Sequence, residues 1–581
     1  MIGRLFTIIA LVAACALAAA SGAIAQQAAP APNASRPTTA AAPPARAAMR
    51  GFLPDPGYVG YSFLQIPGVR GAWRGAPHQG WIQADAHYWP DQGEHLPHGS
   101  MASLGLMANA PVAPGAGPGE LAISIRKNNP ALPALMERCR AHASIDAIDY
   151  AVSAERSQWR GGLKLLAPGM PDYFAYRLSH VEIAECPVVD NAPEQALLLH
   201  FDDIALSNWR SDWQPTLVRP APNPLPPLPA HLTGATKSWL VSWFAMANDG
   251  DAGQCATMNG KPSEADYYAL VPPSDAAQER ASLSSQGGVG FENGQMALRG
   301  PRHLNAVLLP GIVPDPGQAA PVTHVARGFN LDGDTSGRRH RNYTSQDGRL
   351  TGIDNQLFTV LACNPGWQGH RGFMSQYSNE SMRNGQSAML IEVSGIDNEQ
   401  NDPDVYVTVL YTHDQMAKDA SGHTILSDYS FRVTDDPTYT HYFQRARARI
   451  VDGVILTDEM PDFRFNMGMV ASPLPPAPLL SDARMRFQIG ADGSLRGVLG
   501  GYTDWRQICD SNAAAIAEFS FGFQMPAMYN ALRRNADGVR DPVTGEYDAI
   551  SVAFDIEGVP AFAVTAPQAL AHGSEAAGGG R

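Results

Sequence analysis

Residues 121–139 read LAISIRKNNPALPALMERC. From Leu121 to Arg126, apolar residues alternate with small or polar ones, which is the period-two pattern of a β-strand with one buried face. Asn129 can cap a helix and Pro130 fits a first helical position. The next apolar residues fall on one helical stripe: Leu132, Leu135, Met136 and Cys139. The stretch therefore predicts a strand that leads into a short amphipathic helix.

Further β-prone runs lie on both sides of this stretch. They are Tyr61–Ile66, Gly80–His87, Ala147–Val152, Tyr173–Ile183 and Ala196–Leu206. One short helix among many alternating strands predicts a small closed β-barrel flanked by a helix.

The same part of the chain resembles a known family. Ile66–Gly71 and His78–Ile82 are similar to the opening motifs of the Hcp family, the tube proteins of type VI secretion systems. Lys127–Leu132, Tyr173–Val181 and Pro193–Phe201 resemble later motifs of that family, in the same order. The resemblance implies a β-barrel with an edge helix, which assembles into hexameric rings that stack into an effector-delivering tube.

The longer C-terminal part also favours β-structure. Its expected strands are Trp239–Met246, Ala388–Val393, Val405–Thr412, Ala483–Ile489 and Ala549–Ile556. In 445–450 arginines alternate with apolar residues, which indicates a strand with a basic, solvent-facing side. Helical periodicity is limited to Ala513–Phe519 and Pro526–Arg534. We expect a mainly β chain whose second part is a two-sheet sandwich or jelly roll.

Length and composition suggest how the 581 residues are divided. Arg4, the apolar run Leu5–Ala20 and Ala23–Ala25 have the form of a cleavable signal peptide; a retained anchor or a lipoprotein at Cys15 are the alternatives. The expected segments are a signal peptide 1–25, an Ala/Pro-rich disordered tether 26–56, an Hcp-like barrel 57–214, a Pro-rich linker 215–230, a β-rich domain 231–565 and a disordered tail 566–581. This order predicts a periplasmic or secreted protein without a membrane span after cleavage.

The charge balance narrows the classes of partner. The formal net charge is −14, whereas phosphate binding needs a concentrated positive field. We therefore expect neither nucleic acid nor an anionic membrane as a main partner. Self-association through the barrel and a cell-surface or glycan ligand remain expected partners.

After signal cleavage the chain keeps Cys139, Cys186, Cys255, Cys363 and Cys509. An oxidising compartment permits disulfides, and the odd number leaves at least one thiol outside them. Cys139 with Cys186 could close the first domain, and two of the other three could join parts of the second. The absence of C-x-x-C spacing argues against a thiolate zinc site.

A short repeat points to a cation site. Gly352-Ile-Asp-Asn355 recurs as Gly395-Ile-Asp-Asn398, within loops rich in Asp, Asn and Gly. Oxygen clusters of this kind suit calcium, so the expected metal ligands are Asn330, Asp332, Asp334, Asp347, Asp354 and Asp397. Thr335 and Arg341 exclude an EF-hand, and these residues could instead simply form turns. The segments 328–333, 345–348, 352–357 and 493–501 also resemble secreted proteins of unknown function that share a GIDNQL motif.

No catalytic motif is evident, and the catalytic residues stay unknown. The chain contains no G-x-S-x-G, H-E-x-x-H or P-loop sequence. His340, His370, His413 and His423 are expected at the surface or behind other residues. A carboxylate pair of a glycosidase needs no fixed motif, and Trp239, Trp243, Trp367 and Trp505 could line a sugar site.

Three functions follow from these observations. The first is an exported, non-catalytic protein with an Hcp-like docking or assembly barrel and a β-sandwich that binds a ligand or surface. The second is a secreted metal-assisted hydrolase that uses Asp332, Asp334, Asp354 and Asp397. The third is a tube-like type VI component with a C-terminal extension.

Overall fold

A computed structural model describes residues 61–88, 118–206, 225–247, 264–270 and 309–565, apart from short internal gaps, together with a few isolated residues between 255 and 306. The longest gaps within these ranges are 466–478 and 510–524. The described residues all belong to one compact unit. The expected signal peptide, tether and C-terminal tail, and the expected helix Ala513–Phe519, lie outside the described residues.

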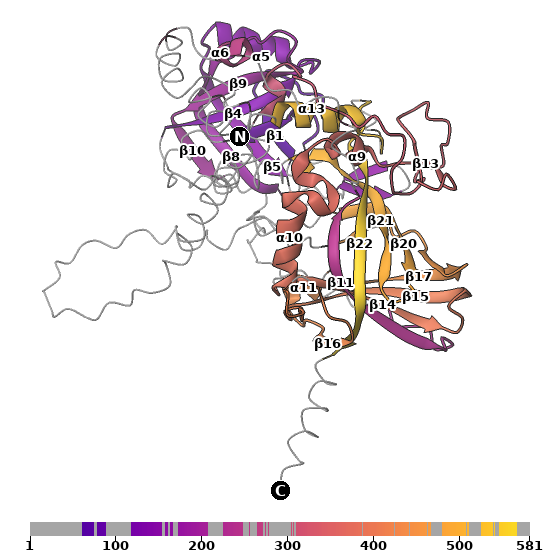
Figure 1. The fold of residues 1–581 in the computed structure, drawn as a ribbon. Helices are drawn as coiled ribbons and strands as arrows, with labels where there is room; N and C mark the ends of the chain where they lie inside the picture. Colours follow the sequence, from indigo (N-terminus) through magenta and orange to yellow (C-terminus); the bar gives the residue numbers. More distant parts are fainter. Residues whose placement is uncertain are drawn as a thin grey trace, which may run out of the picture. The chain divides into compact units, whose positions relative to one another are not determined.

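The chain is mainly β-structured, and its first part is a β-barrel, as predicted (Figure 1). Its sheet has the order β2-β1-β5-β8-β9-β4-β3, and β10 pairs with β8. The strands are β1 (Tyr61–Gln65), β2 (Ile82–Ala84), β3 (Ala86–Tyr88), β4 (Gly119–Arg126), β5 (Ile145–Ser153), β8 (Asp172–Glu185), β9 (Glu194–Phe201) and β10 (Asp203–Leu206). A separate hairpin pairs β6 (Ser157–Arg160) with β7 (Leu163–Leu166).

A corner at Asp85 closes this barrel. β2 pairs with β1 and β3 pairs with β4, yet only Asp85 separates β2 from β3 along the chain. The backbone N–H of Asp85 donates to the carbonyl of Ser124 (2.8 Å). A closed barrel leaves few unpaired strand edges, which are otherwise sites of aggregation.

The helix α5 (Leu132–Arg140) buries the predicted stripe of Leu132, Leu135, Met136 and Cys139. Asn129 does not occupy the capping position, which falls at Ala131; its side chain instead accepts the backbone N–H of Ala131 (3.0 Å). Cys139 bonds to Cys186 at the end of β8, so a disulfide joins helix and barrel as expected. The second disulfide is Cys255–Cys363, and Cys509 is buried outside both.

The second part is built on a ten-stranded sheet. Its strands are β11 (Ala235–Met246), β14 (Ala388–Ile396), β15 (Asn401–Thr412), β16 (Tyr429–Arg432), β17 (Gln444–Val451), β18 (Val454–Thr457), β19 (Phe463–Arg464), β20 (Leu479–Ile489), β21 (Leu495–Asp504) and β22 (Ala549–Val564). A small sheet pairs β12 (Tyr343–Thr344) with β13 (Thr351–Ile353). In β17 the apolar residues Ala446, Ala448 and Ile450 are buried, and Arg447 and Arg449 are exposed.

These strands differ from the expected sandwich in forming one sheet that closes on itself. β11 pairs with β14 along one edge and with β22 along the other, so the first and last long strands meet. Leu240 is paired with both Leu390 and Val559. Alternation along each strand reports only that one face is buried, and it cannot distinguish two facing sheets from one curled sheet.

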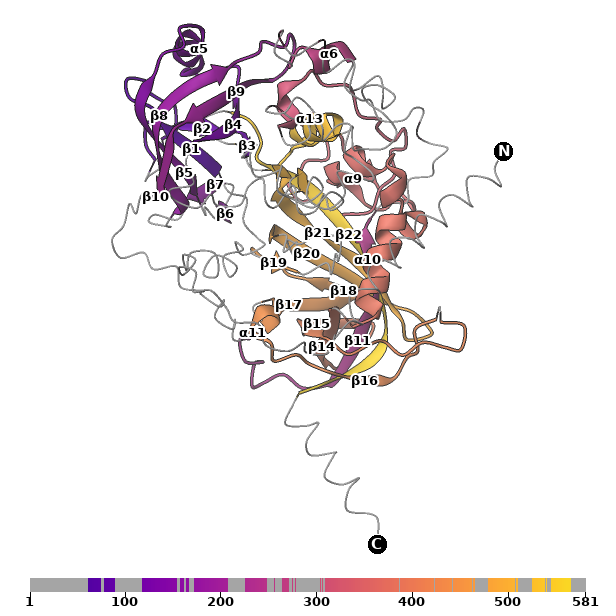
Figure 2. The same ribbon diagram turned by 90° about the vertical axis from the view of Figure 1, so that its left-hand side faces the viewer.

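The helices α9 (Gln356–Leu361) and α10 (Phe373–Arg383) lie against this sheet (Figure 2). The other helices that follow the barrel are α6 (Glu264–Tyr268), α11 (Pro437–Thr440) and α13 (Met525–Asn535), with short turns η3 (Pro310–Ile312), η4 (Pro365–Trp367) and η5 (Gly369–Arg371). The α10 helix lies along β11, where the Asn379 amide exchanges two hydrogen bonds with the backbone of Phe244 (2.7 and 2.8 Å). Only α13 was expected from the sequence. No helix among the described residues has the length and apolar character of a membrane span.

The barrel packs against the second part along the outer faces of β4 and β9. Leu121, Ile123 and Ile125 point into the barrel, but the alternate positions of β4 are also buried. The small apolar side chains on this outer face pack against later residues: Ala122, Ala196 and Leu198 contact a cluster that includes Leu309, Ile312 and Val313.

A buried polar network lies in the same contact. The Glu194 carboxylate accepts hydrogen bonds from Ser124 Oγ (2.7 Å) and from the hydroxyl of Tyr529, and Arg533 Nη1 lies 3.6 Å away. Arg126 forms ion pairs with Asp85 of the barrel (2.7 Å) and with Glu546 of the second part (2.8 Å). Since Glu194 and Arg126 are almost fully buried, breaking these pairs would leave buried charges without partners, which is strongly destabilising.

Candidate metal centre

Side chains that could bind a metal ion lie close together at the end of β13. The backbone N–H of Asp354 donates to the carbonyl of Phe329 (2.7 Å), which brings the segment that follows Phe329 beside Asp354. Asn355 then caps α9 by accepting the N–H of Phe358 (3.1 Å). Asp354 is thus fixed between a strand and a helix, and its side chain is fully buried.

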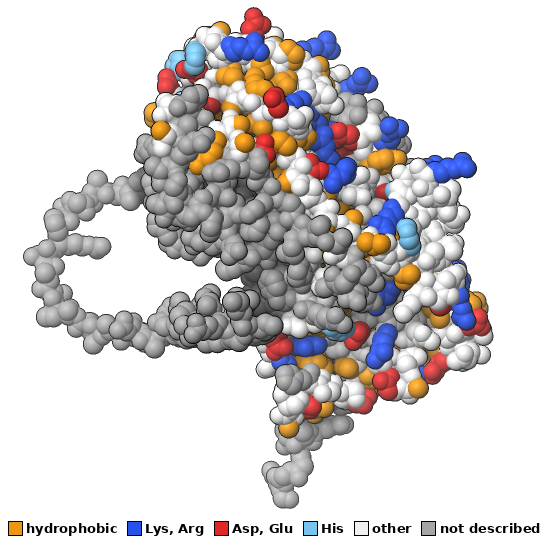
Figure 3. Space-filling view, turned by 45° about the horizontal axis from the view of Figure 1, so that its top comes forward, with side chains coloured by type: hydrophobic (Ala, Val, Ile, Leu, Met, Phe, Trp, Pro, Cys, Tyr) orange, Lys and Arg blue, Asp and Glu red, His pale blue; other side chains and the backbone are white. Residues whose placement is uncertain are grey.

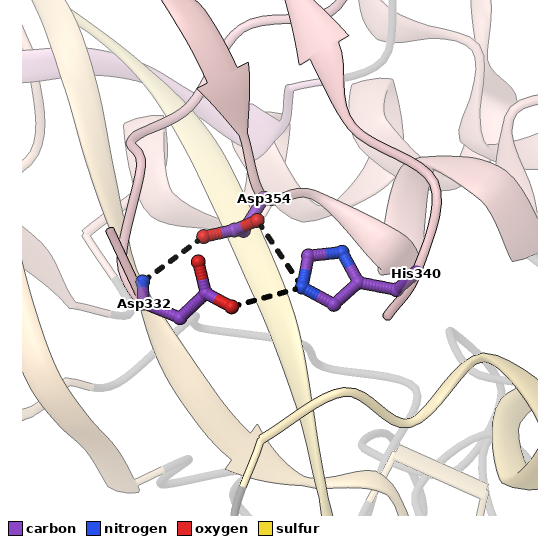
Figure 4. A group of neighbouring side chains, drawn as sticks. All are labelled: Asp332, His340 and Asp354. Carbon is purple, nitrogen blue, oxygen red and sulfur yellow. Dashed lines mark hydrogen bonds and ion pairs between the residues drawn. The ribbon is translucent and has the colours of Figure 1, made fainter. Parts of the chain in front are cut away.

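Three side chains converge here: Asp332, His340 and Asp354 (Figure 4). His340 Nε2 lies 3.3 Å from Asp332 Oδ2 and 3.6 Å from Asp354 Oδ1. Asp354 Oδ2 accepts the backbone N–H groups of Leu331 (2.6 Å) and Asp332 (3.2 Å), whereas Oδ1 has no hydrogen-bond partner within the described part of the chain. One ligand atom from each residue lies within 4.8 Å of the others.

The orientation of the His340 ring is set by its neighbours. Nδ1 lies 3.4 Å from Gln356 Nε2, which donates to the carbonyl of Arg341 (2.5 Å). Gln356 Oε1 in turn accepts from Thr359 Oγ1 (3.1 Å). With Nδ1 held on this side, Nε2 is directed at the two carboxylates.

A further carboxylate, Asp537, follows α13 and contributes to the local charge. Ser551 donates to it from both its backbone N–H and its hydroxyl (2.7 Å each). Burial raises the pKa of Asp537 to about 7 and that of Asp354 to about 6. Burial lowers the pKa of His340, but the charges of Asp537 and Asp354 and the hydrogen bond to Asp332 outweigh it, so this pKa is raised.

The nearby aspartates also affect the pKa of the Tyr502 hydroxyl. Burial and the surrounding aspartates, Asp537 first, raise the pKa of its hydroxyl. The Tyr502 phenol therefore stays neutral, and negative charge in this region resides on the carboxylates.

The structure brings together only part of the predicted ligand set, namely Asp332 and Asp354. Asn330 Oδ1 accepts the N–H of Gly333 (2.6 Å), and Asp334 Oδ1 accepts that of Ser336 (2.7 Å). Asp347 forms an exposed turn with Ser345 and Arg349. Asp397 lies in the turn between β14 and β15, where it accepts from Thr233 (3.1 Å). Asn330, Asp334 and Asp347 thus make local turn contacts, whereas the contact of Asp397 is with a distant segment.

The repeated tetrapeptide adopts a similar backbone at both places but has different surroundings. Gly352 and Gly395 both have positive φ (70° and 89°), and Ile353 and Ile396 are both buried. Only the first copy places its aspartate beside a histidine. The two copies therefore share a strand end with a positive-φ glycine, and the neighbouring segments decide whether the aspartate joins a site.

Two contributors were not predicted. His340 was expected at the surface or behind the residues of a site; its side chain is 10% exposed and lies directly beside Asp332 and Asp354. Asp537 lies in an Asn-Ala-Asp-Gly sequence that is typical of a turn, and no local signal connects it with Asp354. The four tryptophans considered for a sugar site, Trp239, Trp243, Trp367 and Trp505, are all buried.

No protein-family model matches this chain, and no curated protein matches its sequence. Solved structures similar to part of the chain are Hcp and type VI secretion proteins. A type VI secretion system effector from Yersinia pestis has 17% identity and a TM-score of 0.15, over 24% of this chain and 83% of its own. Hcp2 from Salmonella typhimurium has 15% identity and a TM-score of 0.15, over 25% and 91%.

The secreted protein Hcp3 from Pseudomonas aeruginosa has 10% identity and a TM-score of 0.17, over 26% of this chain and 100% of its own. At such values the likeness is restricted to the backbone over about a quarter of the chain, and it does not bear on activity. The resemblance of the C-terminal part to secreted proteins with a GIDNQL motif gains no support from these comparisons.

Proposed function

We propose that the chain is an exported, non-catalytic protein whose Hcp-like barrel mediates self-association. The second β region packs against one face of the barrel and leaves another side for contact with a second copy. The observation that carries this proposal is the one-sided contact of the barrel. Its β4–β9 face is buried against the second region through Glu194, Arg126 and their partners, whereas the β5–β8–β10 side keeps exposed polar residues.

The free side of the barrel has groups suited to contact with a second copy. Arg177 on β8 is well exposed and lies 3.7 Å from Asp149 on β5. His180, Asp202 and Asp203 are exposed nearby. A surface with both signs of charge can be complementary to itself across a twofold or a ring contact.

The sequence resemblance to ring-forming tube proteins supports self-association. A tube-like role is a further alternative, but the second region occupies one barrel face, so assembly has to use the remaining surface.

The distribution of carboxylates argues for a non-catalytic protein over a hydrolase. The hydrolase hypothesis required Asp332, Asp334, Asp354 and Asp397 to act together. Asp354 is fully buried, and Asp334 and Asp397 lie in separate turns. A general acid or nucleophile has to reach its substrate, which a fully buried carboxylate does not do.

Charge on the visible surface is mixed. On the face in Figure 3, basic and acidic side chains are interspersed over the described part. This pattern fits protein contacts better than the concentrated basic field that nucleic acid requires.

Light scattering after size-exclusion chromatography of the mature, full-length protein tests the proposal. We expect an assembly larger than a monomer that is weakened by Arg177→Glu and unchanged by Arg349→Glu, a matched charge reversal at an exposed arginine of the second part. A monomer at every concentration, or equal effects of the two reversals, would contradict self-association through this side. Mass spectrometry should show that the mature protein begins at Gln26, and a different N-terminus would contradict the expected signal peptide 1–25.

A further inference from the structure

Asp354 presents an unusual combination of burial and incomplete hydrogen bonding. Its Oδ2 accepts two backbone N–H groups, but its equally buried Oδ1 has no hydrogen-bond partner among the described residues. His340 Nε2 lies 3.6 Å from Oδ1, which exceeds hydrogen-bonding distance. A buried carboxylate oxygen without a partner is costly, so a ligand for it is expected.

Two of the three separations between ligand atoms are close to those of a tetrahedral metal site, and all three lie within 4.8 Å. With metal–ligand bonds of about 2.0–2.1 Å, two ligands of a tetrahedral zinc ion lie about 3.3–3.4 Å apart. His340 Nε2 lies 3.3 Å from Asp332 Oδ2 and 3.6 Å from Asp354 Oδ1. Small side-chain rotations would therefore bring both carboxylate oxygens and the imidazole nitrogen to bonding distance of one ion.

The donor types distinguish between classes of cation. Calcium takes six to eight oxygen ligands, and the other carboxylates expected from the sequence are not part of this cluster. An imidazole nitrogen with two carboxylate oxygens suits zinc and related first-row transition metals. The sequence alone pointed to calcium, but the ligand set that includes His340 favours a transition-metal ion.

The surroundings support this arrangement. Metal-binding histidines are usually oriented by contacts to the other ring nitrogen, and here Nδ1 faces Gln356 and Arg341. Asp354 is fixed through its second oxygen. Asp537 has both oxygens occupied by Ser551, so it is not a free ligand for the ion.

We propose that Asp332, His340 and Asp354 bind one divalent transition-metal ion, zinc in the first place, and that the fourth position is filled from outside these three side chains. Bound metal would join the segment after Phe329 to the end of β13 and the start of α9. The ion has a structural role in this proposal, because the site holds two chain segments together and its ligands are largely buried.

The test is to titrate chelator-treated, full-length protein with Zn²⁺ and to measure binding by isothermal titration calorimetry. We expect one equivalent of zinc to bind, with calcium unable to displace it. His340→Gln and Asp332→Asn should each weaken zinc binding by at least about 10- to 100-fold, the effect seen even for residues that only support a metal ligand. Asp334→Asn is the matched control, since Asp334 belongs to the same segment but lies outside the cluster.

Titration with Co²⁺ gives an independent measurement on the unaltered protein. Visible absorption typical of tetrahedral cobalt with nitrogen and oxygen ligands is the expected result. The proposal would be overturned by failure to bind zinc, by equal affinities in the His340 and Asp334 variants, or by displacement with calcium. A sulfur-to-cobalt charge-transfer band would also overturn it, because it would place the ion on Cys509. None of these results depends on the oligomeric state, so this proposal and the self-association proposal can fail separately.

Discussion

Replacing Asp537 by asparagine should change how the stability of the protein depends on pH. The Asp537 carboxyl is buried, and its pKa in the folded protein is about 7, compared with 3.8 for an ordinary aspartate. Each pKa unit corresponds to about 1.4 kcal/mol. Ionising Asp537 within the folded protein therefore lowers stability by about 4 kcal/mol in total.

The sign follows from proton binding. The folded state holds the Asp537 proton more tightly than the unfolded state, so the stabilising contribution is complete below the unfolded pKa and is lost as the pH rises through 7. About 3 kcal/mol of this loss falls between pH 4.5 and pH 8. Asparagine stays neutral, so Asp537→Asn should become more stable relative to the wild type by about that amount over the same range.

Urea denaturation of chelator-treated protein, followed by fluorescence at several pH values, measures this difference. Asp347→Asn is the control, since Asp347 lies exposed in a turn, and its profile should follow the wild type closely. Parallel wild-type and Asp537→Asn profiles would refute the argument that burial keeps this carboxyl protonated.

Three other substitutions have outcomes that the structure defines. Replacing Cys139 and Cys186 together by alanine should lower stability by about 4 kcal/mol, the loop-closure entropy for their separation of 47 residues, seen as a lower urea midpoint; an unchanged midpoint would contradict this. Gly352→Ala should destabilise more than Gly348→Ala in thermal melts, because both have φ of +70° but only at Gly352 would a Cβ meet neighbouring atoms, the nearest at 2.7 Å; equal melting temperatures would argue against that close packing. Leu198→Ala should cost about 2–5 kcal/mol and increase hydrogen exchange in both β9 and η3, whereas a change confined to β9 would show that the contact between the two regions is weak.

Local sequence patterns predicted most of the strands and the α5 helix. In Leu121–Arg126 the alternation identified the inward face correctly, since Leu121, Ile123 and Ile125 enter the barrel core. The stripe of α5 is also as expected. Such patterns are reliable here because each of these elements buries one face. The side chains of that face recur at a fixed spacing along the chain, every second residue in a strand and every three to four residues in a helix.

The helices α9 and α10 were not predicted. Every residue of α9, Gln356–Leu361, is buried, so the helix lacks the polar side that would mark a 3.6-residue period. Its start depends on the Asn355 cap, and that signal alone is common in turns.

The sequence by itself determined that the chain is mainly β and where its barrel strands and the α5 helix lie. Only the tertiary structure decided that the outer face of β4 is buried as well, that β11 and β22 close the second sheet, and that His340 and Asp537 lie near Asp354. The physical reason is that a local pattern shows which face of an element leaves water but not what covers it. Contacts between distant segments, such as Glu194 with Tyr529, depend on chain topology, which residue periodicity does not encode.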